Sequence, residues 1–237
     1  NTEELYSGVE FNPVPADLAE VLMKHSKQFG AFRNDPLDQV AISNKIVTRR
    51  GSERIIRAAF EFARSHGRKK VTIIHKANVV RATEGLFLET AREVRKDFPE
   101  IEMDDANIDA ICMWLLKNPL NYDVMVATNM FGDIVSDLSA QMVGGLGFGC
   151  SGNIGKKLGV FEPTHGSAPK YAGQYKVNPI ATILSAKMML EWLGETEKAA
   201  AIEQATAEVI KEGQARTYDM GGSSTTLEVA QAIAAKL

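Results

Sequence analysis

The feature that most constrains the fold is a regular alternation of helical and strand patterns that begins at Ser52. The first predicted helix repeats apolar residues three to four positions apart, at Ile55, Ile56, Ala59, Phe60 and Ala63. Such a repeat is typical of one helix face. Strands are then predicted at 71–75, 101–103 and 124–127, and helices at 84–94 and 108–116. Because strands that alternate with helices form helix-covered sheets, we predict an α/β fold.

The segments on either side of this alternation differ from it. Residues 1–48 give a strand–helix–strand pattern, with strands at 5–11 and 40–48, and too few apolar residues for a core of their own. We therefore predict a clasp-like dimerisation arm there and a small α/β domain with the metal and substrate site at 49–143. Residues 144–237 begin with a glycine-rich stretch and hold only fragments of strand. We predict that they form the C-terminal part of a larger, cofactor-binding domain, with helices at 180–193, 197–212 and 227–237.

Composition excludes several classes of function. The chain has 237 residues and a formal charge of −3 with interspersed signs, which offers no basic surface for nucleic acid. No uninterrupted apolar run approaches the ~20 residues that a membrane helix needs. The two cysteines, Cys112 and Cys150, have neither metal-ligand spacing nor disulfide density, which favours a reducing compartment. We expect a cytoplasmic protein without a nucleic-acid or membrane partner.

Two carboxylates with helical spacing point to a metal. Asp133 and Asp137 are four residues apart and follow the predicted strand 124–127, with Asn129 as the expected N-cap. On a helix, both side chains would project from one face. Carboxylate oxygens at such a place suit a hard divalent cation. Two solvated acids that complement the helix dipole would give the same spacing, so spacing alone leaves both interpretations open.

Other charged residues follow neighbouring predicted strands. Lys76 comes directly after strand 71–75, and Asp104 and Asp105 come after strand 101–103. The carboxyl ends of strands are where α/β sites usually lie. Lys76 there suits proton transfer or a charge clamp, although an ordinary exposed lysine fits its position as well. His75 is expected to be a structural histidine rather than a ligand.

A second group of polar residues lies in a Gly/Pro loop. It comprises His165, Lys170 and Tyr171, with Asn178 just beyond. A lysine provides a point charge and a tyrosine a hydroxyl donor, which together suit a phosphate. As spacing alone this signal is weak, because loops commonly carry both residues.

Six motifs in order make the whole chain resemble one family. They are Asn-Thr-Glu-Glu-Leu-Tyr-Ser-Gly (1–8), His-Lys-Ala-Asn (75–78), Asp-Ala-Asn-Ile-Asp-Ala (105–110), Asn-Met-Phe-Gly-Asp-Ile-Val-Ser-Asp (129–137), Gly-Asn-Ile-Gly (152–155) and Glu-Pro-Thr-His-Gly-Ser-Ala-Pro-Lys-Tyr-Ala-Gly (162–173). The chain resembles the decarboxylating isocitrate, homoisocitrate and 3-isopropylmalate dehydrogenases. Its opening motif is nearer to the isocitrate and homoisocitrate enzymes. The resemblance implies their three-layer α/β/α fold, here without its N-terminal segment.

The resemblance also implies roles in catalysis. Tyr6 matches the tyrosine that protonates the enol carbon after CO₂ leaves. Lys76 matches the neighbouring subunit's lysine that assists proton removal from the substrate hydroxyl, and Asn78 matches a substrate or nicotinamide contact. The carboxylates that would hold Mg²⁺ or Mn²⁺ are Asp133, Asp137 and the neighbour's Asp105. A homodimer with shared active sites follows from these roles.

For the cofactor, the resemblance implies a site at the adenosine end. Its residues would be His165, Lys170, Tyr171, Val177, Asn178 and Tyr218. Lys170 and Tyr171 match the pair of NADP-type enzymes, whereas Gly222 stands where those enzymes carry an arginine. We expect NADP, with NAD as the alternative.

Two hypotheses about function follow. In the first, the chain is the catalytic segment of an NAD(P)-dependent dehydrogenase that converts isocitrate to 2-oxoglutarate, or acts on homoisocitrate or 3-isopropylmalate. In the second, it is a non-catalytic structural or regulatory fragment of such an enzyme. Family members carry a substrate-binding Ser or Thr and carboxylate-binding arginines before this segment, so we expect the isolated segment to be inactive.

Overall fold

The structure is a computed structural model that describes residues 3–237, so Asn1 and Thr2 of the predicted arm lie outside the described residues. Contacts between residues divide the chain into two compact units, Asn1–Val135 and Ser136–Leu237. The division into an arm and two domains at residues 48 and 143 stays a prediction. Across the described residues, no helix is long and apolar enough to cross a membrane. Both cysteines are free thiols.

The first unit is built around a parallel sheet of three strands, β3 (Lys70–His75), β4 (Glu102–Asn107) and β5 (Val124–Ala127), in the order β4-β3-β5. Ile73 of the central strand lies opposite Asp105 of β4 and Val126 of β5. The central strand is buried from Val71 to His75, as the apolar run in the sequence indicated. The prediction of an α/β fold is confirmed.

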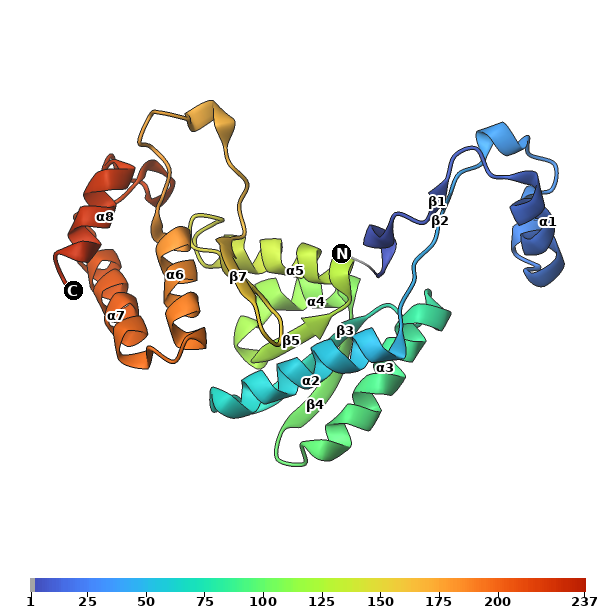
Figure 1. The fold of residues 1–237 in the computed structure, drawn as a ribbon, viewed down its shortest axis with the longest axis horizontal. Coiled ribbons are helices and arrows are strands. Elements are labelled where there is room, and N and C mark those ends of the chain that lie inside the picture. Colours follow the sequence, from blue (N-terminus) through green and yellow to red (C-terminus); the bar gives the residue numbers. More distant parts are fainter. Residues whose placement is uncertain (1–2) are drawn as a thin grey trace. The chain divides into compact units, whose positions relative to one another are not determined.

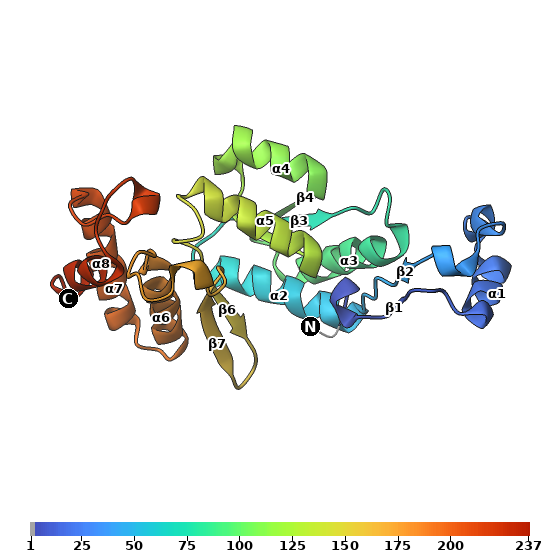
Figure 2. The same cartoon turned by 90° about the horizontal axis from the view of Figure 1, so that it is seen from above.

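Helices cover both faces of this sheet (Figures 1 and 2). They are α2 (Arg49–Ser65), α3 (Arg81–Val94) and α4 (Ile108–Lys117). Val71 and Ile73 pack in one core cluster with residues of α2 and α3, including the fully buried Phe60 and Phe87. Because side chains alternate along a strand, Ile74 faces the opposite side, where α4 lies with its buried Ile111.

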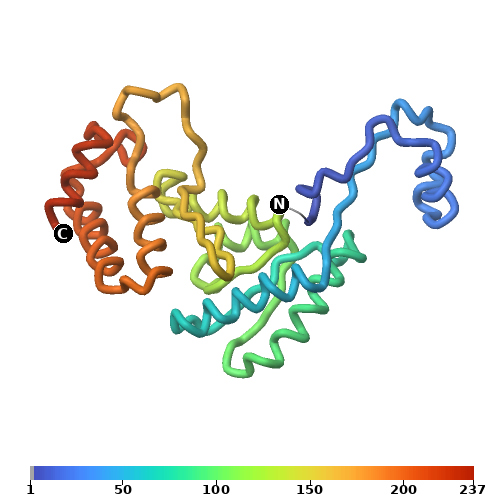
Figure 3. The backbone as a smooth tube through the Cα atoms, in the orientation of Figure 1, coloured from blue at the N-terminus to red at the C-terminus, as the bar shows by residue number. Residues whose placement is uncertain are grey.

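The arm contains less regular structure than its sequence predicted. The predicted strands 5–11 and 40–48 are a 3₁₀ turn (Leu5–Ser7) and two short antiparallel strands, β1 (Glu10–Phe11) and β2 (Ile42–Ser43), which run side by side in Figure 3. Gly8, with a φ of 69°, ends the turn, and the proline at position 13 ends the first strand early. Helix α1 (Ala16–His25) and 3₁₀ turns at Phe29–Phe32 and Leu37–Gln39 complete it.

Two local predictions at the sheet edge are wrong. Asp104 and Asp105 do not follow a strand, because β4 continues through both of them to Asn107. The strand tolerates these acids because it is an edge strand whose neighbour supplies partners, Lys70 for Asp104 and His75 for Asp105. Asn129 is not an N-cap, because helix α5 (Asn129–Met142) begins at this residue.

The second unit follows within α5 and is mainly helical. Its helices are α6 (Ile180–Trp192), α7 (Thr196–Glu212) and α8 (Thr226–Ala234), close to the predicted ranges. Ile180, Val209 and Val229 form the centre of their shared core. The antiparallel hairpin of β6 (Cys150–Ile154) and β7 (Gly159–Pro163) was only partly predicted, because glycines break the apolar pattern of β6. Short 3₁₀ turns lie at Arg95–Asp97, Pro119–Asn121, Pro169–Tyr171 and Tyr218–Met220.

Candidate functional site

Tyr6 and Asp133 meet although they lie 127 positions apart in the chain. The hydroxyl of Tyr6, on the first 3₁₀ turn, donates to Oδ2 of Asp133 on α5. This hydrogen bond, then burial and the charges of Asp133 and Glu4, raise the pKa of Tyr6 above its usual value. The phenol therefore keeps its proton near neutral pH, as a proton donor must.

Helix α5 carries the two candidate metal-binding carboxylates. Phe131 and Val135 are buried on one side of the helix, while Asp133 and Asp137 are exposed on another, four residues apart. Their oxygens have the chemistry that Mg²⁺ or Mn²⁺ prefers, so the donor set fits such an ion. Within residues 3–237 of one chain, however, no three acidic, histidine or cysteine side chains gather closely enough to hold a metal. Asp133 and Asp137 therefore need at least one further ligand to complete a metal site.

Lys76 is held in an ion pair at the end of β3. Its Nζ donates to Oδ1 of Asp109, in the first turn of α4. This hydrogen bond lowers the pKa of Asp109 below its usual value. The Lys76 side chain is 22% exposed, so the ammonium is partly withdrawn from water but still accessible. The ion pair joins the residue after β3 to the first turn of the helix that follows the neighbouring strand β4.

His75 orients Asp105. The amide of Ala77 donates to Nδ1 of His75 at 3.0 Å, so that nitrogen is an acceptor and the proton lies on Nε2. Nε2 donates to Oδ2 of Asp105 at 2.9 Å. His75 is 6% exposed and hydrogen-bonded at both ring nitrogens, as expected of a structural histidine. The carboxylate of Asp105 remains about half exposed and is directed by this bond.

Asn78 lies in the turn that follows Lys76. The amides of Val79 and Val80 donate to the carbonyl of Lys76 and close this turn. Asn78 is exposed, so its amide is available to a ligand near Lys76.

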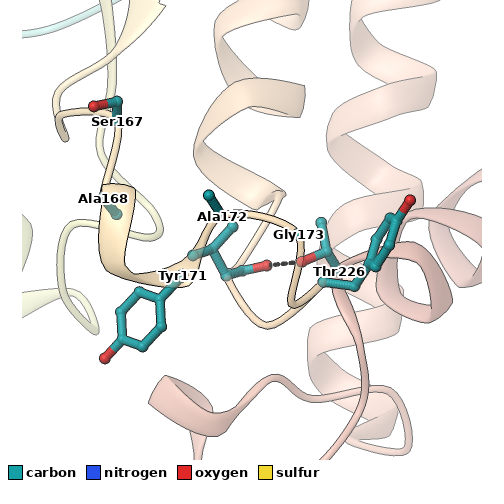
Figure 4. Close-up of a pocket in the computed structure, with 8 residues that line it drawn as sticks. Ser167, Ala168, Tyr171, Ala172, Gly173 and Thr226 are labelled. Atoms are coloured by element: carbon teal, nitrogen blue, oxygen red, sulfur yellow. Dashed lines mark hydrogen bonds between the residues drawn. The ribbon is translucent and has the colours of Figure 1, made fainter.

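The predicted cofactor loop borders a hollow of about 380 Å³ in the second unit (Figure 4). The residues that line it include Ser167, Tyr171, Val177 and Thr226. The Thr226 hydroxyl donates to the carbonyl of Val177 at 2.5 Å and so ties the start of α8 to the loop. The hollow has room for part of a nucleotide, and Tyr171 and Val177 of the predicted set reach it.

Two tyrosines and two lysines gather beside this hollow. The rings of Tyr171 and Tyr218 are 5.7 Å apart between centroids. The ammonium of Lys170 lies 4.8 Å from the Tyr171 ring, and that of Lys176 lies 4.9 Å from the Tyr218 ring. Hydrogen bonds from Tyr218 and Lys170 lower the pKa of Tyr171. Sequence reasoning missed Lys176, whose only signal was a second lysine in the same loop.

The remaining predicted cofactor residues are engaged within the chain. Asn178 is 6% exposed. Its amide donates to Oδ2 of Asp219 and its carbonyl accepts from the amide of Ile180, both at 3.0 Å. His165 is partly buried, and its Nδ1 lies 2.8 Å from the carbonyl oxygen of Gly166. In this arrangement Asn178 fixes the start of α6 and the position of Asp219.

The structure thus places a tyrosine beside a carboxylate, a lysine at a strand end, and a loop with lysines and tyrosines beside a hollow. The chain matches, over residues 1–233, the family described as isocitrate/isopropylmalate dehydrogenase. It belongs to this family of decarboxylating dehydrogenases.

Individual relatives carry different substrate names. The whole chain is 47% identical to 3-isopropylmalate dehydrogenase of Archaeoglobus fulgidus and covers 65% of that protein. Over 194 residues, 82% of the chain, it is 50% identical to isocitrate/homoisocitrate dehydrogenase of Thermus thermophilus and covers 58% of it. A crystal structure of isocitrate dehydrogenase from Methylococcus capsulatus superposes on the whole chain with a TM-score of 0.86 and 44% identity; the chain covers 65% of that structure. The predicted isocitrate dehydrogenase-like fold is thus confirmed.

Proposed function

We propose that the protein containing this chain oxidises and decarboxylates a 2-hydroxy acid, with isocitrate as the favoured substrate. The observation that carries the proposal is the contact between Tyr6 and Asp133. It joins a protonated phenol to a carboxylate of the candidate metal site, so that a proton donor lies beside the position where the substrate's oxygens would bind.

The roles follow from the chemistry of each side chain. Lys76, partly withdrawn from water, assists removal of the proton from the substrate hydroxyl, and Asn78 contacts the substrate. Tyr6 returns a proton to carbon after CO₂ leaves. Asp133 and Asp137 would hold Mg²⁺ or Mn²⁺ together with Asp105 of a second copy. When bound, such an ion supplies Lewis-acid polarisation of the substrate.

A second copy of the chain is the proposed partner. Helix α4 and the turn after it expose large apolar side chains, with Met113 at 55%, Leu116 at 67% and Leu120 at 97% of their full exposure. Patches of this kind mark protein interfaces. A homodimer would cover them and would deliver Lys76 and Asp105 to the partner's site. Sedimentation should show a dimer at micromolar concentration; a stable folded monomer would contradict this part.

NADP is the proposed cofactor, with NAD as the alternative. Lys170 and Lys176 bring two positive charges to Tyr171 and Tyr218. These charges and hydroxyls suit the 2′-phosphate that distinguishes NADP from NAD. The glycine at position 222 adds no side chain to this group. We also propose a cytoplasmic location, in line with the two free thiols.

The test uses the whole protein that contains this sequence. Isocitrate, homoisocitrate and 3-isopropylmalate are each assayed with Mn²⁺ and with NADP or NAD, and both the reduced cofactor and CO₂ are measured. Isocitrate with NADP should give the highest kcat/KM. A higher value for 3-isopropylmalate, the substrate named for the A. fulgidus relative, would overturn the substrate assignment. Metal binding without turnover of any of the three would favour the non-catalytic hypothesis.

A further inference from the structure

Glu4 has a backbone conformation that side chains rarely adopt. Its φ is 70° and its ψ is −155°, a region populated almost only by glycine. Such a conformation persists where surrounding contacts fix it, and it is found most often at functional sites. Glu4 lies two residues before Tyr6, and its carbonyl accepts from the amide and the hydroxyl of Ser7. The strained residue therefore helps to close the turn that presents Tyr6.

Buried contacts hold Glu4 in this conformation. Its amide donates to the carbonyl of Ile46 in an isolated antiparallel bridge. Its carboxylate accepts from the amide of Leu5 at 2.9 Å and lies 2.7 Å from Nζ of Lys45. The Glu4 side chain is 3% exposed and that of Lys45 is 11% exposed. Little water therefore screens the attraction between the two charges.

Lys45 connects this turn to the helix of Asp133. Its Nζ lies 2.6 Å from Oε1 of Glu84, a residue of α3 whose side chain is 0% exposed. The same ammonium donates to the Thr128 hydroxyl at 3.3 Å and lies 4.3 Å from the centroid of the Phe131 ring. Thr128 directly precedes α5, and Phe131 lies in its first turn. A single ammonium thus contacts both elements that carry the Tyr6–Asp133 pair.

This cluster is poorly arranged for stability alone. Two carboxylates share one ammonium, so the group carries a net charge of −1, and Oε2 of Glu84 is buried without a hydrogen-bond partner. Buried ion pairs contribute little net stability, because desolvation offsets their attraction. Buried polar groups are known to fix a single geometry in some proteins. That role explains the presence of this buried charged cluster better than a gain in stability does.

We propose that Lys45 is a positioning residue that acts through Glu4, with Glu84 as its anchor, to hold Tyr6 opposite Asp133. The proposal rests on the proposed role of Tyr6 as the donor of the proton to carbon. If Lys45 is lost, the turn relaxes from its strained conformation and the phenol loses its place. Proton return then slows, whereas binding of substrate and cofactor changes little.

A double-mutant cycle in the whole protein tests this proposal. Lys45→Met, Tyr6→Phe and the double variant are compared for kcat, KM and the solvent deuterium isotope effect on kcat. Lys45→Met should lower kcat about tenfold, leave both KM values within about twofold, and raise the isotope effect because proton return becomes slower. In the Tyr6→Phe background it should cause no further loss. A purely structural role would lower the amount of active enzyme without changing the isotope effect.

Further variants guard against misfolding. Lys45→Met leaves two buried carboxylates without a counter-ion, so Lys45→Met combined with Glu84→Gln, which keeps the net charge of the cluster at −1, is measured beside it. Glu4→Gln retains an acceptor for the Leu5 amide but loses the ion pair, and it should reproduce the effect in weaker form. Lys70→Met is the matched control, because Lys70 pairs with Asp104 on the sheet and is 20% exposed. It should leave kcat and the isotope effect unchanged.

The outcomes separate this inference from the proposed function. If Lys45→Met and Tyr6→Phe each lower kcat and their losses multiply in the double variant, Tyr6 keeps its role and the positioning role of Lys45 is wrong. An unchanged isotope effect in all three Lys45 and Glu4 variants would also overturn it. If the wild type turns over none of the three acids, or Tyr6→Phe retains full activity, the proposed function fails first.

Discussion

The two units hold their candidate residues in different ways. In the first unit three pairs of polar side chains are held by specific contacts: Tyr6 with Asp133, Lys76 with Asp109, and His75 with Asp105. In the second unit the ammonium groups of Lys170 and Lys176 lie over the rings of Tyr171 and Tyr218 beside a hollow, and Lys170 also forms a hydrogen bond with Tyr171. The first unit holds individual polar atoms at hydrogen-bond distances, whereas the loop of the second unit mainly brings positive charge close to the two tyrosines.

This difference has a kinetic consequence. Proton transfer requires hydrogen-bond distances, so small displacements of Tyr6 or Lys76 are costly. Recognition of a phosphate by flexible lysines depends mainly on charge and tolerates displacement. Changes in the first unit should therefore lower kcat or remove the metal. Changes in the loop should act on the KM for the cofactor.

The largest expected effect is on the metal. Asp133→Asn removes a charged ligand and should weaken Mn²⁺ binding by at least about 100-fold, because loss of a group that merely supports a ligand already costs 10–100-fold. Isothermal titration of the whole protein with Mn²⁺ gives the affinity without requiring turnover. Asp97→Asn is the control, since Asp97 is an exposed acid paired with Arg57. An Mn²⁺ affinity equal to that of the wild type would remove α5 from the metal site.

Lys76→Met should lower kcat about 100-fold, the usual scale for a positioned proton-transfer group. The KM for the cofactor should stay unchanged, because the loop of the second unit is intact. Lys69→Met is the control, because Lys69 is an exposed lysine directly before the start of β3. The measurement is steady-state kinetics across pH. If Lys76→Met instead left kcat unchanged and raised only the KM for the cofactor, the proposed difference between the two units would be wrong.

The elements that could be predicted from the sequence are those with local signals. The apolar run 124–127 coincides with β5, and helix α7 has nearly the predicted ends. The full length of β4 could not be predicted, because its acids are stabilised by neighbours that are more than 25 positions away in sequence, Lys70 and His75. Strand prediction from sequence patterns relies on apolar residues in a buried sheet, so it does not detect a polar edge strand.

The candidate site shows the same division. The i, i+4 spacing of Asp133 and Asp137 was visible because helix geometry is local. The ion cluster of Lys45, Glu4 and Glu84 was not, since it joins three segments and has no spacing of its own. The backbone of Glu4 was equally hidden, because no glycine marks its positive φ.

A smaller effect is expected for the cofactor. Replacing Lys170 with Asp and Tyr171 with Ile should remove a preference for NADP of about tenfold. The change deletes two hydrogen-bond donors to the 2′-phosphate and adds a negative charge that repels it. The ratio of kcat/KM values for NADP and NAD measures it, and kcat at saturating cofactor should remain near that of the wild type. A wild type that already prefers NAD would contradict the NADP assignment. A fall in kcat with both cofactors would instead show that the loop fixes reacting atoms as the first unit does.

The smallest effect concerns Lys176, which only the structure brought into the site. Its ammonium lies 5.4 Å from the centroid of the Tyr171 ring and 4.9 Å from that of Tyr218. Exposed charges of this kind contribute little individually, so Lys176→Met should raise the KM for NADP about two- to fivefold and leave kcat unchanged. The effect should fade as ionic strength rises and the charge is screened. Lys157→Met, an exposed lysine in the turn of the β6–β7 hairpin, is the control. A lysine that acts only by its charge has less effect on the KM for NADP at high ionic strength, whereas a lysine held in a fixed hydrogen bond keeps its effect. A change in KM that does not depend on salt would therefore show that Lys176 makes a fixed contact.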